Sequence, residues 1–297
     1  MRSFRGVRGR FFVWVLLVVS CAGLQGQTRI DIAGAVEWDN MEINAEVSLN
    51  LASANIKLPA GRTQAEALIG AEYIRLIRPG ILNLPVDSSA TIASLINRGE
   101  FSLLQAENLA LGARMVPHSL SPDLSTLSAA YSVSLAGVSA ELIRHSRPAE
   151  IPRTLSPVPA PAYTGIIIIA GGELPVHGKK SAALPVPCLF PKVWDTEMNL
   201  IYERNMLEPR NMTMVRYAPA ESVFRPTPSG LSAEITALVG QTPLRILARG
   251  VFGERPTDPI IDRADALQII SSEENRRLLR EGRVVLVLDG SVLKSEL

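Results

Sequence analysis

The sequence contains few of the residues that most often carry chemistry. Its 297 residues include only two cysteines and three histidines, and aromatic residues make up 5%. Positive and negative charges nearly cancel, with 30 basic and 29 acidic side chains. Because a nucleic-acid-binding surface needs clustered basic residues, this balance predicts no nucleic-acid partner. We also expect no cofactor, since no glycine-rich phosphate loop and no paired cysteine motif is present.

The N-terminus has the three parts of a bacterial secretory signal. Four arginines lie among the first ten residues, an apolar run covers residues 11–19, and small residues occupy 20–23. The apolar run is short for a membrane span, which takes about 20 residues. We therefore expect residues 1–26 to be a signal peptide, although an uncut membrane anchor is the alternative. The expected location is the periplasm or a membrane that faces it.

The end of this signal leaves the processing site open. Cleavage after Ala22 or after Gly26 would release a chain without a lipid. Cys21, which follows Val-Val-Ser, resembles instead the cysteine that is acylated in bacterial lipoproteins. Several acyl chains at that position would attach the protein durably to a membrane. Once Cys21 is removed or acylated, Cys188 is the last cysteine, so no internal disulfide is possible.

Residues 27–146 are expected to form an α+β domain. Apolar and polar residues alternate along 43–51 and again along 127–143, which is typical of strands with one buried and one wet face. Between them, residues 61–78 have the apolar spacing of a helix. We expect this helix to end at Pro79, because a proline removes a backbone hydrogen bond and crowds the preceding turn.

Residues 147–161 contain five prolines and no apolar period, which predicts an extended linker between two domains. A long surface loop inside one domain is the alternative. Residues 162–297 then form a second α+β domain. Its four successive isoleucines, 166–169, predict a central strand that is buried on both faces, with helices from 262–282 covering at least one of them. The expected architecture is therefore two small α+β domains with mainly antiparallel sheets.

Most candidate reactive residues have a simple structural explanation. Cys188 lies among prolines and apolar side chains, which indicates a buried, inert thiol. Acidic residues at the starts of predicted helices serve as caps and interact with the helix dipole. These acidic residues are Asp258, Asp262 and Asp265.

The remaining polar candidates also lack a catalytic spacing. The histidines, His118, His145 and His177, are not spaced as ligands of one metal ion. A charged loop follows the isoleucine strand and is most simply a solvated turn. It contains Glu173, His177, Lys179 and Lys180. We predict no catalytic, cofactor-binding or metal-binding residue, so the chain is not expected to be an enzyme.

Short motifs in the C-terminal half support a family comparison. Tyr163-Thr164-Gly165 precedes the isoleucine strand, Pro191–Asp195 reads PKVWD, and Val284–Val287 follows an Asp265-Ala266 pair. This pattern resembles bacterial envelope proteins related to the flagellar assembly protein T and to small outer-membrane lipoproteins. The resemblance covers about residues 163–289. It implies a periplasmic protein of a flagellar or envelope assembly, and it offers no catalytic residues to carry over.

The function that we expect is that of a non-catalytic exported envelope protein, a structural or accessory component of a periplasmic assembly such as the flagellum. Its partners would be other envelope or flagellar proteins, with membrane attachment if Cys21 is acylated. One alternative is a periplasmic ligand-binding protein with a cleft between its two domains. Another is a secreted hydrolase whose serine, histidine and acidic residues meet only in the folded chain.

Overall fold

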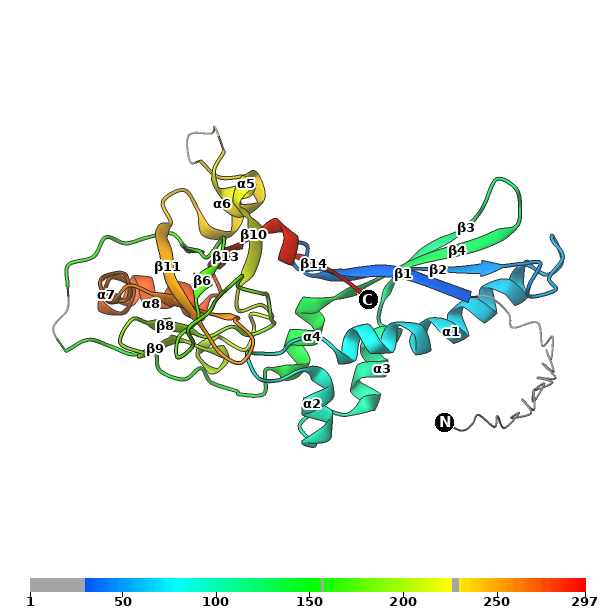
Figure 1. Cartoon of the computed structure of the whole chain (residues 1–297). Coiled ribbons are helices and arrows are strands. Elements are labelled where there is room, and N and C mark those ends of the chain that lie inside the picture. The colour runs from blue at the N-terminus through cyan, green and yellow to red at the C-terminus, as the bar shows by residue number, and fades with distance from the viewer. Residues whose placement is uncertain (1–29, 156–157, 226–229) are drawn as a thin grey trace, which may run out of the picture.

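The structure, a computed structural model, describes residues 30–155, 158–225 and 230–297. The expected signal peptide of residues 1–26 and the acylation site at Cys21 lie outside these ranges. The described residues fold into two units, each built on its own sheet with helices packed against it (Figure 1). This confirms the predicted α+β class with two domains.

The first unit (residues 30–143 and 294–297) is a five-stranded antiparallel sheet in the order β14-β1-β2-β4-β3. Its strands are β1 (Ile30–Glu37), β2 (Glu42–Asn50), β3 (Arg114–Leu120), β4 (Thr126–Ser134) and β14 (Lys294–Glu296). Its helices are α1 (Arg62–Leu82), α2 (Ile92–Asn97), α3 (Leu103–Leu111) and α4 (Leu135–Leu142). Helix α1 contacts β1, β2 and β4, so it covers one face of the sheet (Figure 1).

Alternating side chains explain why this sheet has one covered face and one open face. On β2, Ile43, Val47 and Leu49 are each 0% exposed. They belong to one apolar cluster with Ile69 and Ile77 of α1. The polar residues between them are half-buried or exposed on the opposite face. The predicted strand with one buried and one wet face is therefore confirmed.

Two element boundaries differ from the sequence expectation. Helix α1 continues through Pro79 for three more residues. This proline lies in the last turn, where it costs one hydrogen bond, and its carbonyl oxygen still accepts the N–H of Asn83 at 3.0 Å. The alternation expected over 127–143 ends at Ser134. Its side chain accepts a hydrogen bond from the Gly137 N–H, and this cap begins helix α4.

The second unit (residues 163–293) holds a mixed sheet in the order β10-β13-β5-β11-β12-β8-β9. Its strands are β5 (Ile166–Ile169), β8 (Val193–Asp195), β9 (Leu200–Tyr202), β10 (Arg216–Pro219), β11 (Leu244–Phe252), β12 (Asp258–Ile261) and β13 (Val284–Leu288). A separate small hairpin pairs β6 (Leu174–Pro175) with β7 (Ala182–Ala183). The neighbouring strands β10, β13, β5 and β11 run parallel, whereas β12 is antiparallel to β11. Antiparallel pairings still outnumber parallel ones over the described ranges.

Helices cover both faces of this second sheet. They are α5 (Ala220–Val223), α6 (Ala233–Val239), α7 (Arg263–Ser271) and α8 (Glu273–Arg280). Strand β5 lies between β13 and β11, and its residues Ile166, Ile167 and Ile168 are at most 1% exposed. Ile167 shares an apolar cluster with Val239 of α6, whereas Ile168 belongs to the cluster that contains Leu278 of α8. The predicted interior strand with helices from 262–282 on one face is confirmed.

Backbone hydrogen bonds join the two units. The Leu189 N–H donates to the carbonyl oxygen of Pro85 at 3.0 Å, and the Phe190 N–H donates to that of Val86 at 2.8 Å. Trp38 of the first unit also meets the ring of Tyr217 edge-on, with centroids 5.7 Å apart. The largest apolar cluster includes buried residues from both units, so the two cores are continuous.

The C-terminal residues cross back to the first unit. Strand β14 pairs with residues 35–37 of β1, although the sequence analysis placed all of 162–297 in the second domain. This pairing satisfies backbone groups at the edge of β1 that would otherwise be open. The expected linker, 147–161, contains no helix or strand in its described part. Ile151 within it is only 1% exposed, so this segment is packed and not merely extended.

Candidate functional site

A recess lies on the open face of the first sheet, opposite helix α1. Strand register brings side chains from all five strands to this face. We define the open face by these residues: Asp31, Ala33, Ala35, Glu37, Glu42, Asn44, Glu46, Arg114, Val116, Ala130, Ser132, Lys294 and Glu296. At its centre is a shallow recess of about 500 Å³.

Small side chains form the floor of this recess. Ala33 of β1 lies opposite Glu46 of β2, which in turn lies opposite Ala130 of β4. In the next row, Ala35 and Ser132 flank Asn44. Alanine and serine side chains project little from a sheet, so another polypeptide can approach this backbone closely.

Charged side chains surround the floor. Lys294 Nζ lies 2.9 Å from Glu37 Oε1, and an Arg114 guanidinium nitrogen lies 3.6 Å from a carboxylate oxygen of Glu42. The hydrogen bond from Lys294, with others from Asn40 and Asn44, lowers the pKa of Glu37. Acidic residues predominate on the open face: positions 31, 37, 42, 46 and 296 are acidic, whereas 114 and 294 are basic. The face therefore favours a ligand that carries positive charge.

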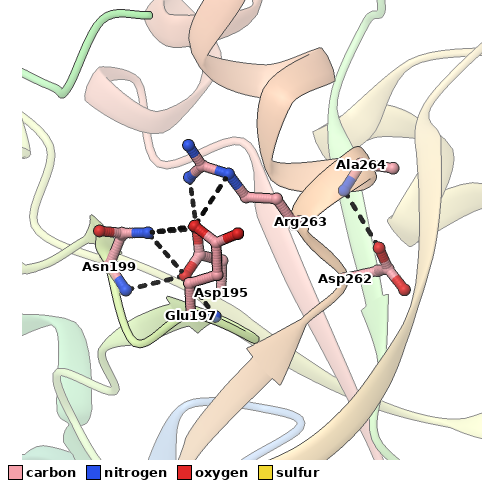
Figure 2. A network of polar contacts seen from close by, with 6 residues as sticks. All are labelled: Asp195, Glu197, Asn199, Asp262, Arg263 and Ala264. Atoms are coloured by element: carbon pink, nitrogen blue, oxygen red, sulfur yellow. Dashed lines mark hydrogen bonds and ion pairs between the residues drawn. The ribbon is translucent and has the colours of Figure 1, made fainter.

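A second polar cluster, centred on Asp195, closes a hairpin of the second unit (Figure 2). Asp195 ends β8 and its side chain is fully buried, with Oδ2 at 2.5 Å from a guanidinium nitrogen of Arg263. Asp195 Oδ1 accepts the backbone N–H groups of Glu197 at 3.0 Å and Asn199 at 2.8 Å. Burial raises the pKa of Asp195, but the hydrogen bonds from Asn199 and Arg263 outweigh it and lower the pKa overall. Both carboxylate oxygens are engaged, so this cluster fastens the β8–β9 turn to α7.

The structure places the sequence-derived acidic candidates in different settings. Asp262 caps helix α7, as predicted, because its Oδ1 accepts the N–H of Ala264 at 3.1 Å (Figure 2). Asp265 lies in the first turn of the same helix. The prediction for Asp258 is wrong, because this residue begins strand β12 and not a helix. It is 1% exposed, and burial raises the pKa of its carboxyl group.

Cys188 is fully buried, as the sequence indicated. Its backbone N–H donates to the hydroxyl oxygen of Tyr217 at 3.0 Å, and that hydroxyl donates to the Cys188 carbonyl oxygen at 2.7 Å. Burial raises the pKa of the thiol, so it stays protonated at neutral pH. A buried neutral thiol is a poor nucleophile and a poor metal ligand.

The three histidines lie in different parts of the fold. His118 lies on β3, His145 Nε2 lies 2.7 Å from the Leu207 carbonyl oxygen, and His177 lies in the turn between β6 and β7. In that turn, Lys179 and Lys180 are exposed. Across the part of the chain that the structure describes, no group of three His, Cys, Asp or Glu side chains is placed to hold a metal ion. The same part contains no helix with the length and apolarity that a membrane span requires.

Two family models match the chain, one for each unit. Residues 29–141 match the N-terminal domain of Treponema pallidum Tp0624, and residues 165–290 match the second domain of Tp0624. Along this chain the match to the N-terminal domain comes first and the match to the second domain follows it. A search of curated proteins found no match. The relation to the flagellar assembly protein T stays a prediction.

Proposed function

We propose that this chain is a non-catalytic exported envelope protein that serves as a structural or accessory component of a periplasmic assembly. In this proposal the open face of the first sheet is the surface on which a partner docks. The supporting observation is an asymmetry between the units. Helices cover both faces of the second sheet, whereas α1 covers one face of the first sheet and the other carries the recess of about 500 Å³. The secretory signal that the sequence predicts in residues 1–26 supports the periplasmic location.

The chemistry of the open face suits a protein partner. The alanine and serine floor allows close approach, and Asn44 supplies hydrogen-bonding groups beside it. The acidic excess around the floor favours a partner segment that contains lysine or arginine, and opposite charges mainly increase specificity and the association rate. Such binding weakens as the salt concentration rises, because exposed charges are screened.

Crosslinking and pull-down of the mature protein from its native envelope test this proposal. Ala130→Arg fills the recess and adds a positive charge, so we expect it to lose the partners that the wild-type protein captures. Ala182→Arg, on the exposed strand β7 of the second unit, is the matched control and should retain them. Both variants should melt at the temperature of the wild-type protein, because both positions can accommodate an exposed side chain.

Two results would contradict the proposal. One is an identical set of captured partners for wild type and Ala130→Arg. The other is a clean gene deletion that leaves envelope integrity and motility unchanged. Motility is included because the resemblance of residues 163–289 points to flagellar assembly.

A second candidate function is ligand binding between the two units. A recess of about 330 Å³ lies there, lined by residues of the β1–β2 turn and by Pro219, Gly290 and Lys294. Lys294 is already paired with Glu37, which leaves fewer charged groups for a ligand. A small molecule that raises the melting temperature of the wild-type protein, but not that of Gly290→Trp, would favour this function over the first.

A further inference from the structure

The far end of the first unit carries an apolar surface that the proposed function does not use. Here β2 passes into α1 through residues 51–61, and β3 turns into β4 through residues 121–125. We call these two turns the distal tip. Strand β14 and the second unit lie at the other end of the sheet (Figure 1). The distal tip is therefore the part of the first unit farthest from the second unit.

An apolar recess of about 320 Å³ lies between the two turns of the distal tip and the ends of α1, β3 and β4 beside them. Its lining residues are Leu58, Pro59, Arg62, Leu120, Leu124 and Leu127. Leu124 is 60% exposed and has a φ of 57°, a backbone conformation that is costly for a side chain of this size. Leu124 is thus a largely exposed apolar side chain that forms part of the wall of the recess.

The chain enters the first unit at this same end. Ile30, the first residue of β1, pairs with Leu49, which pairs with Leu127, which pairs with Leu120. These four residues form one row across the sheet beside the distal tip. Cys21 precedes Ile30 by nine residues (30 − 21), which span at most about 30 Å when extended. A lipid on Cys21 would thus hold the distal tip within that distance of a membrane.

We propose that the distal tip rests on the surface of a lipid bilayer, with Leu124 and the walls of its recess in contact with acyl chains. This inference rests on the proposed export of the chain to the envelope. The depth of contact is limited by Asp123. Hydrogen bonds from the hydroxyl groups of Ser121 and Ser125 lower its pKa to about 2, so the carboxylate beside Leu124 remains charged. A charged group is costly in hydrocarbon, so the contact stays in the interfacial layer.

Flotation of the unacylated chain that starts at Gln27, with vesicles of phosphatidylethanolamine and phosphatidylglycerol, tests the contact without the lipid anchor. We expect the wild-type chain to float and Leu124→Asn to partition about tenfold more weakly, because transfer of a leucine side chain out of water changes a partition constant by roughly that factor. Asparagine tolerates positive φ, so the turn should keep its shape. The control is Leu111→Asn, since Leu111 is 65% exposed at the end of α3, away from the distal tip. It should float as the wild type does.

A fluorescent reporter gives a second readout. Leu124→Trp should be quenched by vesicles of brominated lipid, and Leu111→Trp should not. The proposal is overturned if the wild-type chain stays in solution with these vesicles, if both asparagine variants lose binding equally, or if free fatty acid binds the recess and vesicles do not. The docking of a partner on the open face is measured separately by the Ala130→Arg pull-down. Failure of either experiment therefore leaves the other result interpretable.

Discussion

The central strand β5 provides the sharpest test of the core of the second unit. Ile167 and Ile168 are adjacent, so their side chains point to opposite faces of the sheet, and they are 0% and 1% exposed. Ile167 packs with Val239 of α6, and Ile168 packs with the cluster that includes Leu278 of α8. Truncation of a fully buried isoleucine to alanine typically costs about 2–5 kcal/mol. Each variant should therefore lose a large share of a domain stability of about 5–15 kcal/mol.

Urea denaturation followed by far-ultraviolet circular dichroism measures these losses for Ile167→Ala and Ile168→Ala. Ile169→Ala is the matched control, because the side chain of Ile169 is only half-buried and should cost clearly less. A loss below about 1 kcal/mol for either buried position would mean that the corresponding sheet face is not covered, which would refute the assignment of helices to both faces. Equal losses at all three positions would show that burial at β5 does not follow the structure.

Two further predictions concern acid stability and proteolysis. Hydrogen bonds from Arg280 and then from Arg276 lower the pKa of Glu273 from 4.5 to about 2, so its contribution to stability is present above about pH 4.5 and is lost as the pH falls toward 2. At neutral pH the urea midpoint of Glu273→Gln should be only slightly below that of the wild type, since the Glu273 side chain is half exposed. This difference in midpoint should vanish near pH 2. A difference that grows as the pH falls would contradict the prediction. Trypsin should cut after the exposed residue Arg153, whereas the bond after Arg147 resists trypsin because Pro148 follows it. The fragments should co-elute until denaturant is added because of the continuous core and the β1–β14 pairing, whereas independent elution would contradict that contact.

Local patterns in the sequence predicted much of the fold. The alternation along residues 43–51 identified β2 and its two faces, and four successive isoleucines identified β5 as an interior strand. Asp262 was correctly identified as a helix cap, because a cap depends on residues within one turn. One error was local: helix α1 tolerates Pro79 because the proline lies in its last turn. The error at Asp258 occurred where distant contacts decide the outcome, because this residue begins a buried strand and does not cap a helix.

The same distinction between local and distant contacts explains why the sequence did not reveal the open face. Alternation shows that each strand has one wet side, but it does not show that the wet sides of β1, β2 and β4 lie together. Lys294, which pairs with Glu37 at the edge of this face, is 257 residues away in the chain. Register decides which side chains share the face, since a slip of one residue would turn Ala33 and Ala35 toward α1 and bring Ile32 and Val36 to the surface. The open face is therefore a property of strand register and not of any motif, and a change that shifts β1 against β2 should abolish it even if every residue that lines it is kept.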